Sequence, residues 1–502
     1  MPDPAQTIVH PFLKQVGAKT LMRPFTRAWT WIRNWLHIPR SVASLQDEIE
    51  QLHGTVRDLR GALDEVSATT GSTLAVTKTL KRNTAQLTDA LARLDGQNRA
   101  ALGAASLAAR QARQGGSGPG PLRIAFLVHN VETWLSLRPV YSRMQDDARF
   151  EPVVFSIPRR FPGAEEFRDE DLTSAALSGA GVAHVRLNDT DPYRDLDRLR
   201  AHGIDAIFRQ SHWSKDVPAA FDSLNLSFAR QYYVPYEIAT ISMHGVDYLR
   251  TYHHDLCDRA FVACDLLKEM MEIRDPHRRA NITVSGHPKV PEILGAAPDW
   301  PIHSGNTKRL LWSAHHAVGT GWNNFGVFPD IFGDMLALAK RRPDLDILFS
   351  PHPALMSVLQ GADPPLAREI EAFFEDWAAL PNTGHLQDGP YTGAFKASDL
   401  LIVDGLSFLI EYQLNEKPVI NLVRPDRSEL NPIGDMVMAG AHPLPVADIG
   451  GLECLIDRIY AGDVAPKQAA QASLKALFTA QPDPAGTILD AVWQDCRDSH
   501  PG

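Results

Sequence analysis

The chain has 502 residues, with a hydrophobic share of 44% and a charged share of 22%, which is enough for two or three ordinary globular domains. A formal net charge of −10 argues against general nucleic-acid binding. The four cysteines lack metal-binding spacing, so we expect free thiols in a reducing compartment. No apolar run approaches the roughly 18 residues that a membrane span needs, and no signal-peptide core is visible, so we expect a cytoplasmic protein.

Residues 1–40 differ in character from the rest of the chain. They hold six Lys and Arg residues against one acid, Asp3, with Trp29, Trp31 and Trp35 interleaved. Basic residues among tryptophans suit an anionic membrane surface, which predicts peripheral binding to the inner membrane. The alternative is an aromatic segment that packs on the protein's own body or on a partner helix.

Residues 41–113 show a heptad pattern. Apolar residues alternate steps of three and four, which predicts a long coiled-coil helix and a homo-oligomer. The alternative is a helix folded back onto the body of the protein. Residues 114–121 read QGGSGPGP, a flexible linker and a domain boundary. The positions of the seam are Leu45, Ile49, Leu52, Val56, Leu59, Leu63, Val66, Leu80, Leu87, Leu91 and Leu94.

An α/β body begins at residue 122. Apolar runs at 123–128, 152–155, 182–185, 206–208 and 259–263 predict strands, with helices such as 191–201 between them. This alternation predicts a first Rossmann-like domain over residues 122–290, which residues 283–289 close with a strand and a turn. No glycine fingerprint follows the first strand, so a dinucleotide site is not expected there. His287 is interpreted as a turn residue at the hinge.

A second Rossmann-like domain is predicted over residues 291–502, and residues 346–423 are its core. The short apolar runs 347–349, 400–403 and 419–423 are typical of buried parallel strands. His352 follows the first run, and Asp404 and Ser407 follow the second. Parallel sheets bind ligands at the carboxyl ends of their strands, and a helix that starts at Ser407 would offer free N–H groups to a phosphate.

Further strands of the second domain are predicted at 309–314 and 444–449, with helices at 325–340, 452–460, 467–478 and 487–496. The run 309–314 ends at His315 and His316. Adjacent side chains on an extended segment point in opposite directions, so we expect one of the two histidines in the site and the other in a structural role.

Several of these stretches resemble the CDP-glycerol glycerophosphotransferases, the teichoic-acid and capsule polymerase family. They are SPHP at 350–353, DGPY and FKASD within 388–399, DGLSFLIEY with KPVINL within 404–422, and LLWSAHHAVGTGWNNFGVF at 310–328. The resemblance covers about residues 232–423. It implies a GT-B-like pair of Rossmann-like domains, after the long N-terminal helix, whose last helix crosses back to the first domain. It also implies transfer of a phospho-polyol from a CDP-activated donor to a glycan or lipid-linked acceptor, without a cofactor.

The resemblance assigns roles to residues of the second domain. His352 matches a histidine that contacts the donor phosphates or acts in catalysis, and one of His315 and His316 joins it. The alternative for His352 is a loop histidine held by the backbone. YVPY at 233–236 resembles the capsule relatives, but the polymerases' histidine–glycine motif is missing there, which leaves the acceptor-side base unassigned.

Four residues are candidates for donor binding, each with a simpler alternative. Asp388 would orient a histidine or hold the ribose, or else form a turn. Asp404 ends the strand before the phosphate-type helix. Ser407 would donate to a phosphate, or else only cap the helix. Glu411 would accept from ribose hydroxyls, or else be a solvated helix residue. No carboxylate spacing in these blocks predicts a metal site.

Three functions remain open at this point. The first is the CDP-polyol phosphotransferase, an enzyme of surface-glycan synthesis. The second is a GT-B glycosyltransferase that uses a nucleotide sugar. The third is an inactive GT-B scaffold in a glycan assembly complex.

Overall fold

A computed structural model describes residues 50–61, 84, 120–160, 166–243, 251–274, 281–318, 324–359, 364–386 and 391–497. The chain divides into two compact units, residues 1–105 and 106–502. In the first unit, residues 50–61 form a helix inside the predicted heptad region. The segment 1–40, the rest of 41–113 and most of the linker 114–121 lie outside the described residues. The coiled coil, the homo-oligomer and the membrane contact therefore stay predictions.

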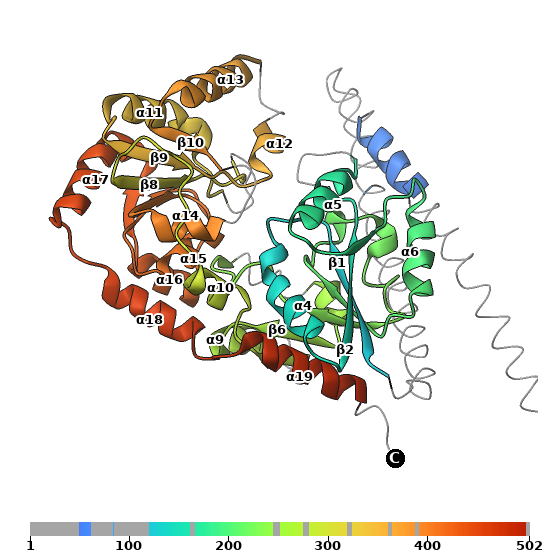
Figure 1. The fold of residues 1–502 in the computed structure, drawn as a ribbon. Coiled ribbons are helices and arrows are strands. Elements are labelled where there is room, and N and C mark those ends of the chain that lie inside the picture. Colours follow the sequence, from blue (N-terminus) through green and yellow to red (C-terminus); the bar gives the residue numbers. More distant parts are fainter. Residues whose placement is uncertain are drawn as a thin grey trace, which may run out of the picture. The chain divides into compact units, whose positions relative to one another are not determined.

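The second unit begins with a seven-stranded sheet whose described pairings are all parallel. Its strand order is β3-β2-β1-β4-β5-β6-β7 (Figure 1), so the chain reverses direction across the sheet between β1 and β4. Such a reversal point opens a crevice at the carboxyl ends of the strands. The strands are β1 (Leu122–Val128), β2 (Phe150–Ser156), β3 (His184–Arg186), β4 (Ala206–Arg209), β5 (Arg230–Tyr233), β6 (Arg259–Val262) and β7 (Ile282–Val284).

Helices connect these strands and cover the sheet. They are η2 (Trp134–Ser136), α4 (Arg138–Gln145), α5 (Glu170–Gly179), α6 (Pro192–Ala201), η3 (Ser214–Asp216), η4 (Ala219–Phe221), α8 (Tyr252–Leu256), α9 (Asp265–Arg274) and α10 (Lys289–Gly295). The predicted helix 191–201 is α6, and Asp191 caps it by accepting a hydrogen bond from the Tyr193 amide.

The second sheet repeats the plan with six strands, in the order β10-β9-β8-β11-β12-β13, again with parallel pairings. Its reversal point lies between β8 and β11. The strands are β8 (Lys308–Ser313), β9 (Leu345–Phe349), β10 (Thr383–His385), β11 (Leu400–Val403), β12 (Val419–Val423) and β13 (His442–Pro445). The helices are α11 (Phe328–Arg341), α12 (Leu355–Leu359), α13 (Pro364–Ala379), α14 (Tyr391–Ala397), α15 (Ser407–Gln413), α16 (Pro432–Ala439), η7 (Val446–Gly451), α17 (Leu452–Ala461) and α18 (Gln468–Phe478).

The central strands are buried on both faces, as their unbroken apolar runs predict. Every residue of β9 and β11 is buried, and Trp312 of β8 lies in a cluster of aromatic rings with Phe328, Phe349 and Trp377. Burying such side chains stabilises the fold by about 1.5–3 kcal/mol each. Apolar runs therefore mark the strands in the middle of the second sheet.

The predictions were weaker at the sheet edges and at one central strand. No strand was predicted at β5, whose four residues include Arg230 and Gln231, or at β10, a three-residue edge strand with Gly384 at its centre. The run predicted as a strand at 444–449 was misplaced, because β13 ends at Pro445 and residues Val446–Gly451 form 3-10 turns. Edge strands carry fewer apolar residues and accept proline, so their patterns are hard to recognise.

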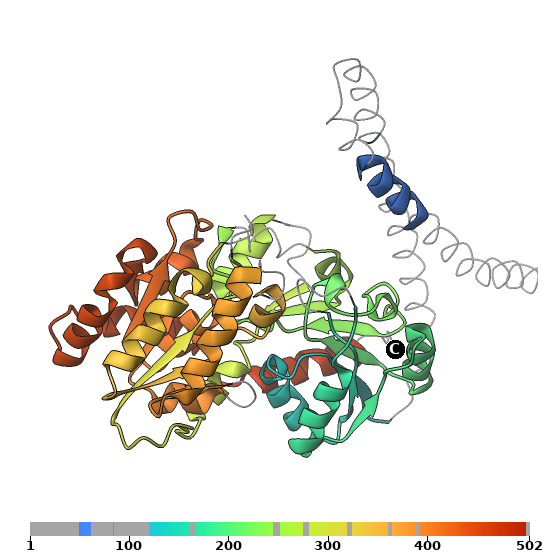
Figure 2. The same ribbon diagram turned by 90° about the horizontal axis from the view of Figure 1, so that it is seen from above.

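The last helix, α19 (Pro484–Arg497), packs on the first domain although it follows the second in sequence (Figures 1 and 2). Ile488 and Val492 join the core formed by β1 and α4, and Asp495 forms an ion pair with Arg259 of β6. This confirms the expected crossing of the C-terminal helix.

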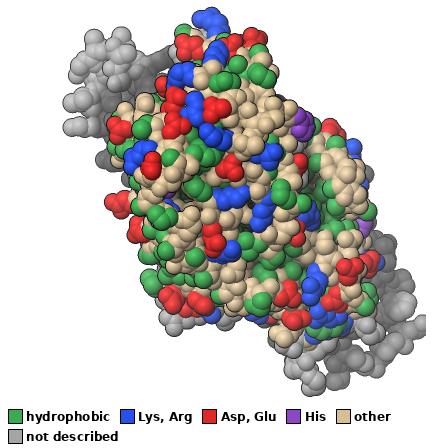
Figure 3. Space-filling view, turned by 60° about the vertical axis from the view of Figure 1, so that its left-hand side comes forward, with side chains coloured by type: hydrophobic (Ala, Val, Ile, Leu, Met, Phe, Trp, Pro, Cys, Tyr) green, Lys and Arg blue, Asp and Glu red, His purple; other side chains and the backbone are tan. Residues whose placement is uncertain are grey.

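The surface agrees with the weakly acidic composition. On the face drawn in Figure 3, acidic and basic side chains of the described residues are mixed rather than gathered into one basic patch. No helix in the described part of the chain is both long and apolar enough to cross a membrane.

Candidate active site

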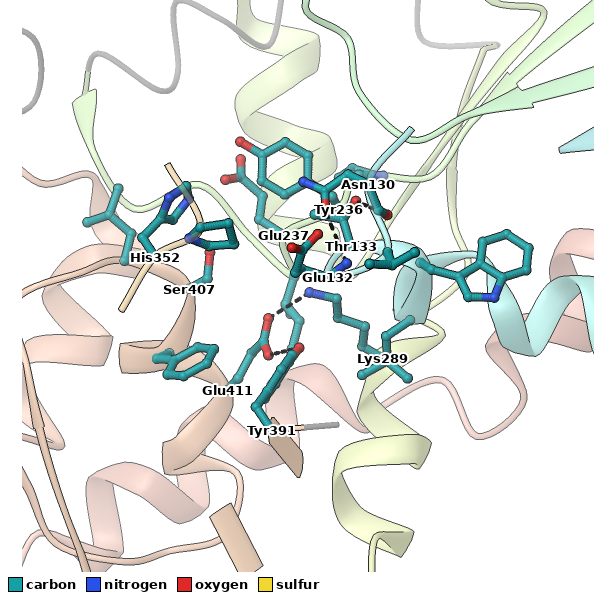
Figure 4. A pocket seen from close by; sticks show the side chains of 18 of the residues that line it. Asn130, Glu132, Thr133, Tyr236, Glu237, Lys289, His352, Tyr391, Ser407 and Glu411 are labelled. Atoms are coloured by element: carbon teal, nitrogen blue, oxygen red, sulfur yellow. Dashed lines mark hydrogen bonds and ion pairs between the residues drawn. The ribbon is translucent and has the colours of Figure 1, made fainter. Parts of the chain in front are cut away.

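A pocket of about 910 Å³ lies where the carboxyl ends of the two sheets face each other. This volume is within the range of small-molecule sites. The first domain contributes residues after β1, β4 and β5, and the second contributes residues after β8, β9 and β11. The polar and aromatic residues that line it include Asn130, Glu132, Arg138, His212, Trp213, Tyr236, Glu237, Lys289, His315, His316, His352, Tyr391, Ser407 and Glu411. Figure 4 shows part of this lining, with Glu237, Lys289, His352 and Glu411 among the labelled residues.

Three histidines of the second domain form one cluster in this pocket. The ring centroid of His316 lies 4.1 Å from that of His352 and 4.4 Å from that of His315. The rings of His315 and His352 are 5.5 Å apart. The cluster forms because the His352 amide donates a hydrogen bond to the Ala314 carbonyl at 2.8 Å, which joins the loops after β9 and β8.

The expectation that His315 and His316 point in opposite directions was wrong. It assumed an extended backbone, but β8 ends at Ser313 and the chain then turns, with the Val318 amide bonded to the His316 carbonyl at 3.0 Å. Both rings consequently line the pocket.

The hydrogen bonds of the cluster determine which ring nitrogen carries the proton in two of the histidines. Nδ1 of His315 accepts from the Ala317 amide at 3.1 Å, and Nδ1 of His352 accepts from the Ala354 amide at 3.1 Å. A neutral imidazole whose Nδ1 accepts carries its proton on Nε2, so each ring offers an Nε2–H donor. Nδ1 of His316 is buried and has no hydrogen-bond partner among the described residues.

Burial lowers the pKa of all three histidines. The pKa of His316 falls to about 4, and the pKa values of His315 and His352 fall well below the usual value because burial adds to repulsion from the neighbouring rings. The free site therefore holds neutral imidazoles at neutral pH. In the described part of the chain, no group of three or more His, Cys, Asp or Glu side chains is arranged to hold a metal ion.

Asp404 supports the cluster and does not line the pocket. Its carboxylate accepts from the amides of His315 and Val327, both at 2.7 Å. Burial raises the pKa of Asp404 to about 7 against the effect of these bonds. Its two oxygens hold the loops after β8 and before α11, which argues against the predicted role of Asp404 in donor binding.

Ser407 lies in the pocket at the first position of α15. The N-cap position belongs to Leu406, so the interpretation of Ser407 as a plain cap was wrong. The Ser407 side chain makes no hydrogen bond to a described residue, and a ligand in the pocket could therefore bind it. Asp388 lies outside the described residues.

Glu411 is buried and already bound, so it is not the solvated helix residue of the simpler interpretation. Its Oε1 lies 2.9 Å from the Nζ of Lys289, and its Oε2 accepts from the Tyr391 hydroxyl at 2.6 Å (Figure 4). Both oxygens are engaged, which argues against the predicted contact of Glu411 with ribose hydroxyls. The pair instead joins α10, next to the first sheet, to α15 of the second domain.

The sequence analysis missed Lys289, Tyr391 and Glu237. Glu237 follows β5 in the stretch YVPYE, where only the resemblance to the capsule relatives had drawn attention. The pKa of Glu237 is raised to about 7, mainly by burial, while Lys289 opposes the rise and Glu411 adds to it. Nothing in the local residue pattern signals such an environment, because its causes lie on α10 and α15.

Comparison with known proteins identifies the architecture. A putative UDP-N-acetylglucosamine 2-epimerase from Listeria monocytogenes superposes with a TM-score of 0.54 at 12% identity, over 76% of this chain and 98% of that one. The chain has a GT-B-like fold. S. aureus MnaA in a structure with UDP gives 0.51 at 12% identity, over 74% of this chain and 96% of that one. The UDP-GlcNAc 2-epimerase of Neisseria meningitidis bound to UDP-GlcNAc gives 0.50 at 14%, over 74% and 100%.

At these identities the likeness concerns the fold alone. No family model matches the chain, and no curated protein is similar to it in sequence. The GT-B-like architecture expected from the motifs is thus confirmed, whereas membership in the CDP-glycerol glycerophosphotransferase family is not shown.

Proposed function

We propose that this chain is a GT-B-type enzyme that binds a nucleotide-activated sugar between its two domains and transfers the sugar to an acceptor. The observation that carries this proposal is the cluster of His315, His316 and His352 at the carboxyl edge of the second sheet, facing the pocket. Ser407, at the start of α15, lies in the same pocket.

The cluster suits the diphosphate of such a donor. Two neutral imidazoles offer Nε2–H groups, and hydrogen bonds to an anion are stronger than those between neutral groups. When the glycosidic bond to the diphosphate breaks, negative charge develops on the leaving nucleotide. Donors already held in place stabilise this charge without reorganising during the reaction.

The relatives favour a uridine nucleotide. Two solved structures with the same fold contain UDP or UDP-GlcNAc, according to their descriptions. We therefore choose a UDP-sugar as the donor to test first. The acceptor we propose is a glycan or a lipid-linked glycan of the cell surface.

Transfer of a phospho-polyol from a CDP-activated donor is the second candidate. It is favoured by the motif stretches that carry His352 and the 310–328 block, and by the same histidine cluster. In that reaction the acceptor attacks phosphorus and CMP leaves, so the histidines would stabilise charge on both phosphoryl groups.

A donor panel separates these reactions. The full chain is incubated with UDP-GlcNAc, UDP-glucose, CDP-glycerol and CDP-ribitol in the presence of a glycan acceptor extract, and released nucleotides are separated by chromatography. We expect acceptor-dependent release of UDP. Release of CMP would support the second candidate, and conversion of the UDP-sugar without release of UDP would identify an epimerase. If no donor reacts or shifts the melting temperature, the inactive scaffold is favoured, since a ligand at a hundred times its Kd adds about 2.7 kcal/mol to stability.

The proposal also assigns roles to the N-terminal part of the chain, namely self-association and membrane binding. We propose that residues 41–113 join copies of the chain and that residues 1–40 bind an anionic inner-membrane surface. Sedimentation of the full chain should give a mass above one copy. A single-copy mass at high concentration would contradict the coiled coil.

A further inference from the structure

Among the described residues, three carboxylates line the pocket, and they differ in what they bind. Glu132 pairs with Arg159 at 3.1 Å, and Glu411 pairs with Lys289 at 2.9 Å. The carboxylate of Glu237 receives no hydrogen bond or ion pair from any described residue. A pocket-lining carboxylate without a partner remains available to a ligand.

The loop that carries Glu237 is held in place from several sides. The His287 Nε2–H donates to the Pro235 carbonyl at 2.8 Å, and Ile238 is buried in the core between the sheets. The Asn431 side chain of the second domain donates to the Thr240 carbonyl at 2.9 Å. The position of Glu237 is thus determined by contacts with both domains.

The charged and titratable groups around Glu237 come from four elements. Lys289 lies on α10, Glu411 on α15, Tyr233 on β5, and Tyr236 on the loop after β5. Burial is the main cause that raises the pKa of Glu237 to about 7, and Glu411 adds to it while Lys289 opposes it. Burial also raises the pKa of the two tyrosines, so neither hydroxyl accepts a proton near neutral pH.

We infer that Glu237 is the general base that takes the proton from the acceptor hydroxyl. This inference rests on the proposed function and assigns the role that the missing histidine–glycine motif leaves open. The acceptor oxygen forms its new bond to the anomeric carbon of the donor, the bond from that carbon to the diphosphate oxygen breaks, and UDP leaves with the electron pair. The acceptor proton moves to the Glu237 carboxylate and returns to solvent after the product leaves. The proton balance is the same if the atom attacked is phosphorus.

In this assignment, the two domains supply different catalytic functions from opposite walls of the pocket (Figure 4). The second domain presents His352 and Ser407, which suit the anionic donor, and the first domain presents Glu237. Base and diphosphate would then belong to different domains. Losing the base should slow transfer and leave nucleotide binding unchanged.

The test compares Glu237→Gln with the unmodified chain, using the donor that the panel identifies. General bases contribute about 10²–10⁴-fold to a rate, so we expect Glu237→Gln to lower kcat by at least about 100-fold. The melting-temperature shift produced by UDP should stay the same. Glu371→Gln, on the exposed face of α13, is the matched control and should keep full activity.

The pH profile separates a base from a positioning residue. The base acts only when it is deprotonated, so kcat/KM of the unmodified chain should fall tenfold per pH unit below about pH 7. This slope should be absent in the residual activity of Glu237→Gln. Glu237→Asp should keep the slope at a lower rate, and its profile decides the matter if the Gln variant does not fold.

The outcomes are distinguishable. An unmodified chain that turns over no activated donor overturns the proposed function and the inference together. A chain that transfers, but whose Glu237→Gln variant stays within a few-fold of the unmodified rate or keeps the same pH slope, overturns the inference alone.

Discussion

At the reversal point of each sheet, one side chain accepts hydrogen bonds from the backbone that follows the first strand of that sheet. In the first, Gln210 follows β4 and its Oε1 accepts from the amides of His129 and Asn130, at 2.8 and 3.0 Å, just after β1. In the second, Asp404 follows β11 and accepts from the His315 amide after β8 and the Val327 amide before α11. In each sheet, the residue after the fourth strand holds the backbone that leaves the first strand.

The residues held in this way differ between the two sheets. His129 is buried, does not line the pocket, and has a pKa that burial lowers to about 3. His315 lines the pocket together with His316 and His352. Gln210 also donates from Nε2 to the Asn130 carbonyl at 2.7 Å, so its side chain binds both the amide and the carbonyl of Asn130. The comparison teaches that the same support leaves the histidine after β1 buried away from the pocket in the first domain, and presents the histidine after β8 to the pocket in the second.

The largest expected loss of stability comes from breaking the buried Lys289–Glu411 ion pair, which connects the two domains. Lys289→Met leaves the Glu411 carboxylate buried without its cation, and removing one partner of a buried pair costs about 3–5 kcal/mol. Denaturant unfolding would measure this loss. The double variant Lys289→Met with Glu411→Gln should recover part of it, because the uncompensated charge is then gone. Equal stabilities of the single and double variants would contradict the pairing.

The next largest effect is expected on the rate, when the hydrogen-bond donor of His352 is removed. His352→Ala should lower kcat about 10²–10³-fold, the usual effect of removing one donor to developing charge. Its melting temperature should change little, because the ring lines the pocket and does not belong to the apolar core. His303→Ala, at an exposed position, serves as the control. Full activity of His352→Ala would show that the histidine cluster is not the donor site.

A smaller loss of stability is expected when Asp404, which supports the loop of His315, is changed. In Asp404→Asn one oxygen still accepts an amide, but the new NH₂ group faces the other N–H donor. An unsatisfied buried donor costs about 1–3 kcal/mol, so the free energy of unfolding should fall by that amount. Asp448→Asn on the surface should stay within about 0.5 kcal/mol of the unmodified chain. If Asp404→Asn loses activity at unchanged stability, Asp404 acts directly on the ligand rather than as a support for the loops.

The sequence by itself determined the parts of this protein that depend on local pattern. Short, mostly apolar runs predicted β1, β9, β11 and β12, because strands buried on both faces carry apolar residues at most positions. The same runs placed His315, His316 and His352 at strand ends. Since parallel strands end at a common edge, this was sufficient to predict that His352 and one of His315 and His316 share a site, and the turn after β8 brings in the other. The predicted roles of the N-terminal 113 residues and of Asp388 concern parts that lie outside the described structure.

Only the tertiary structure decided which polar groups remain free for a ligand. Glu411 and Lys289 are 122 positions apart in the chain, so no local pattern shows that they neutralise each other. Asp404 follows a strand as a ligand-binding aspartate would, yet backbone amides from two distant loops occupy its oxygens. Glu237 has no unusual neighbours in sequence, and its environment arises from burial between two domains. Hydrogen bonding and desolvation depend on which segments meet when the chain folds, and these contacts decide the chemistry of each carboxylate.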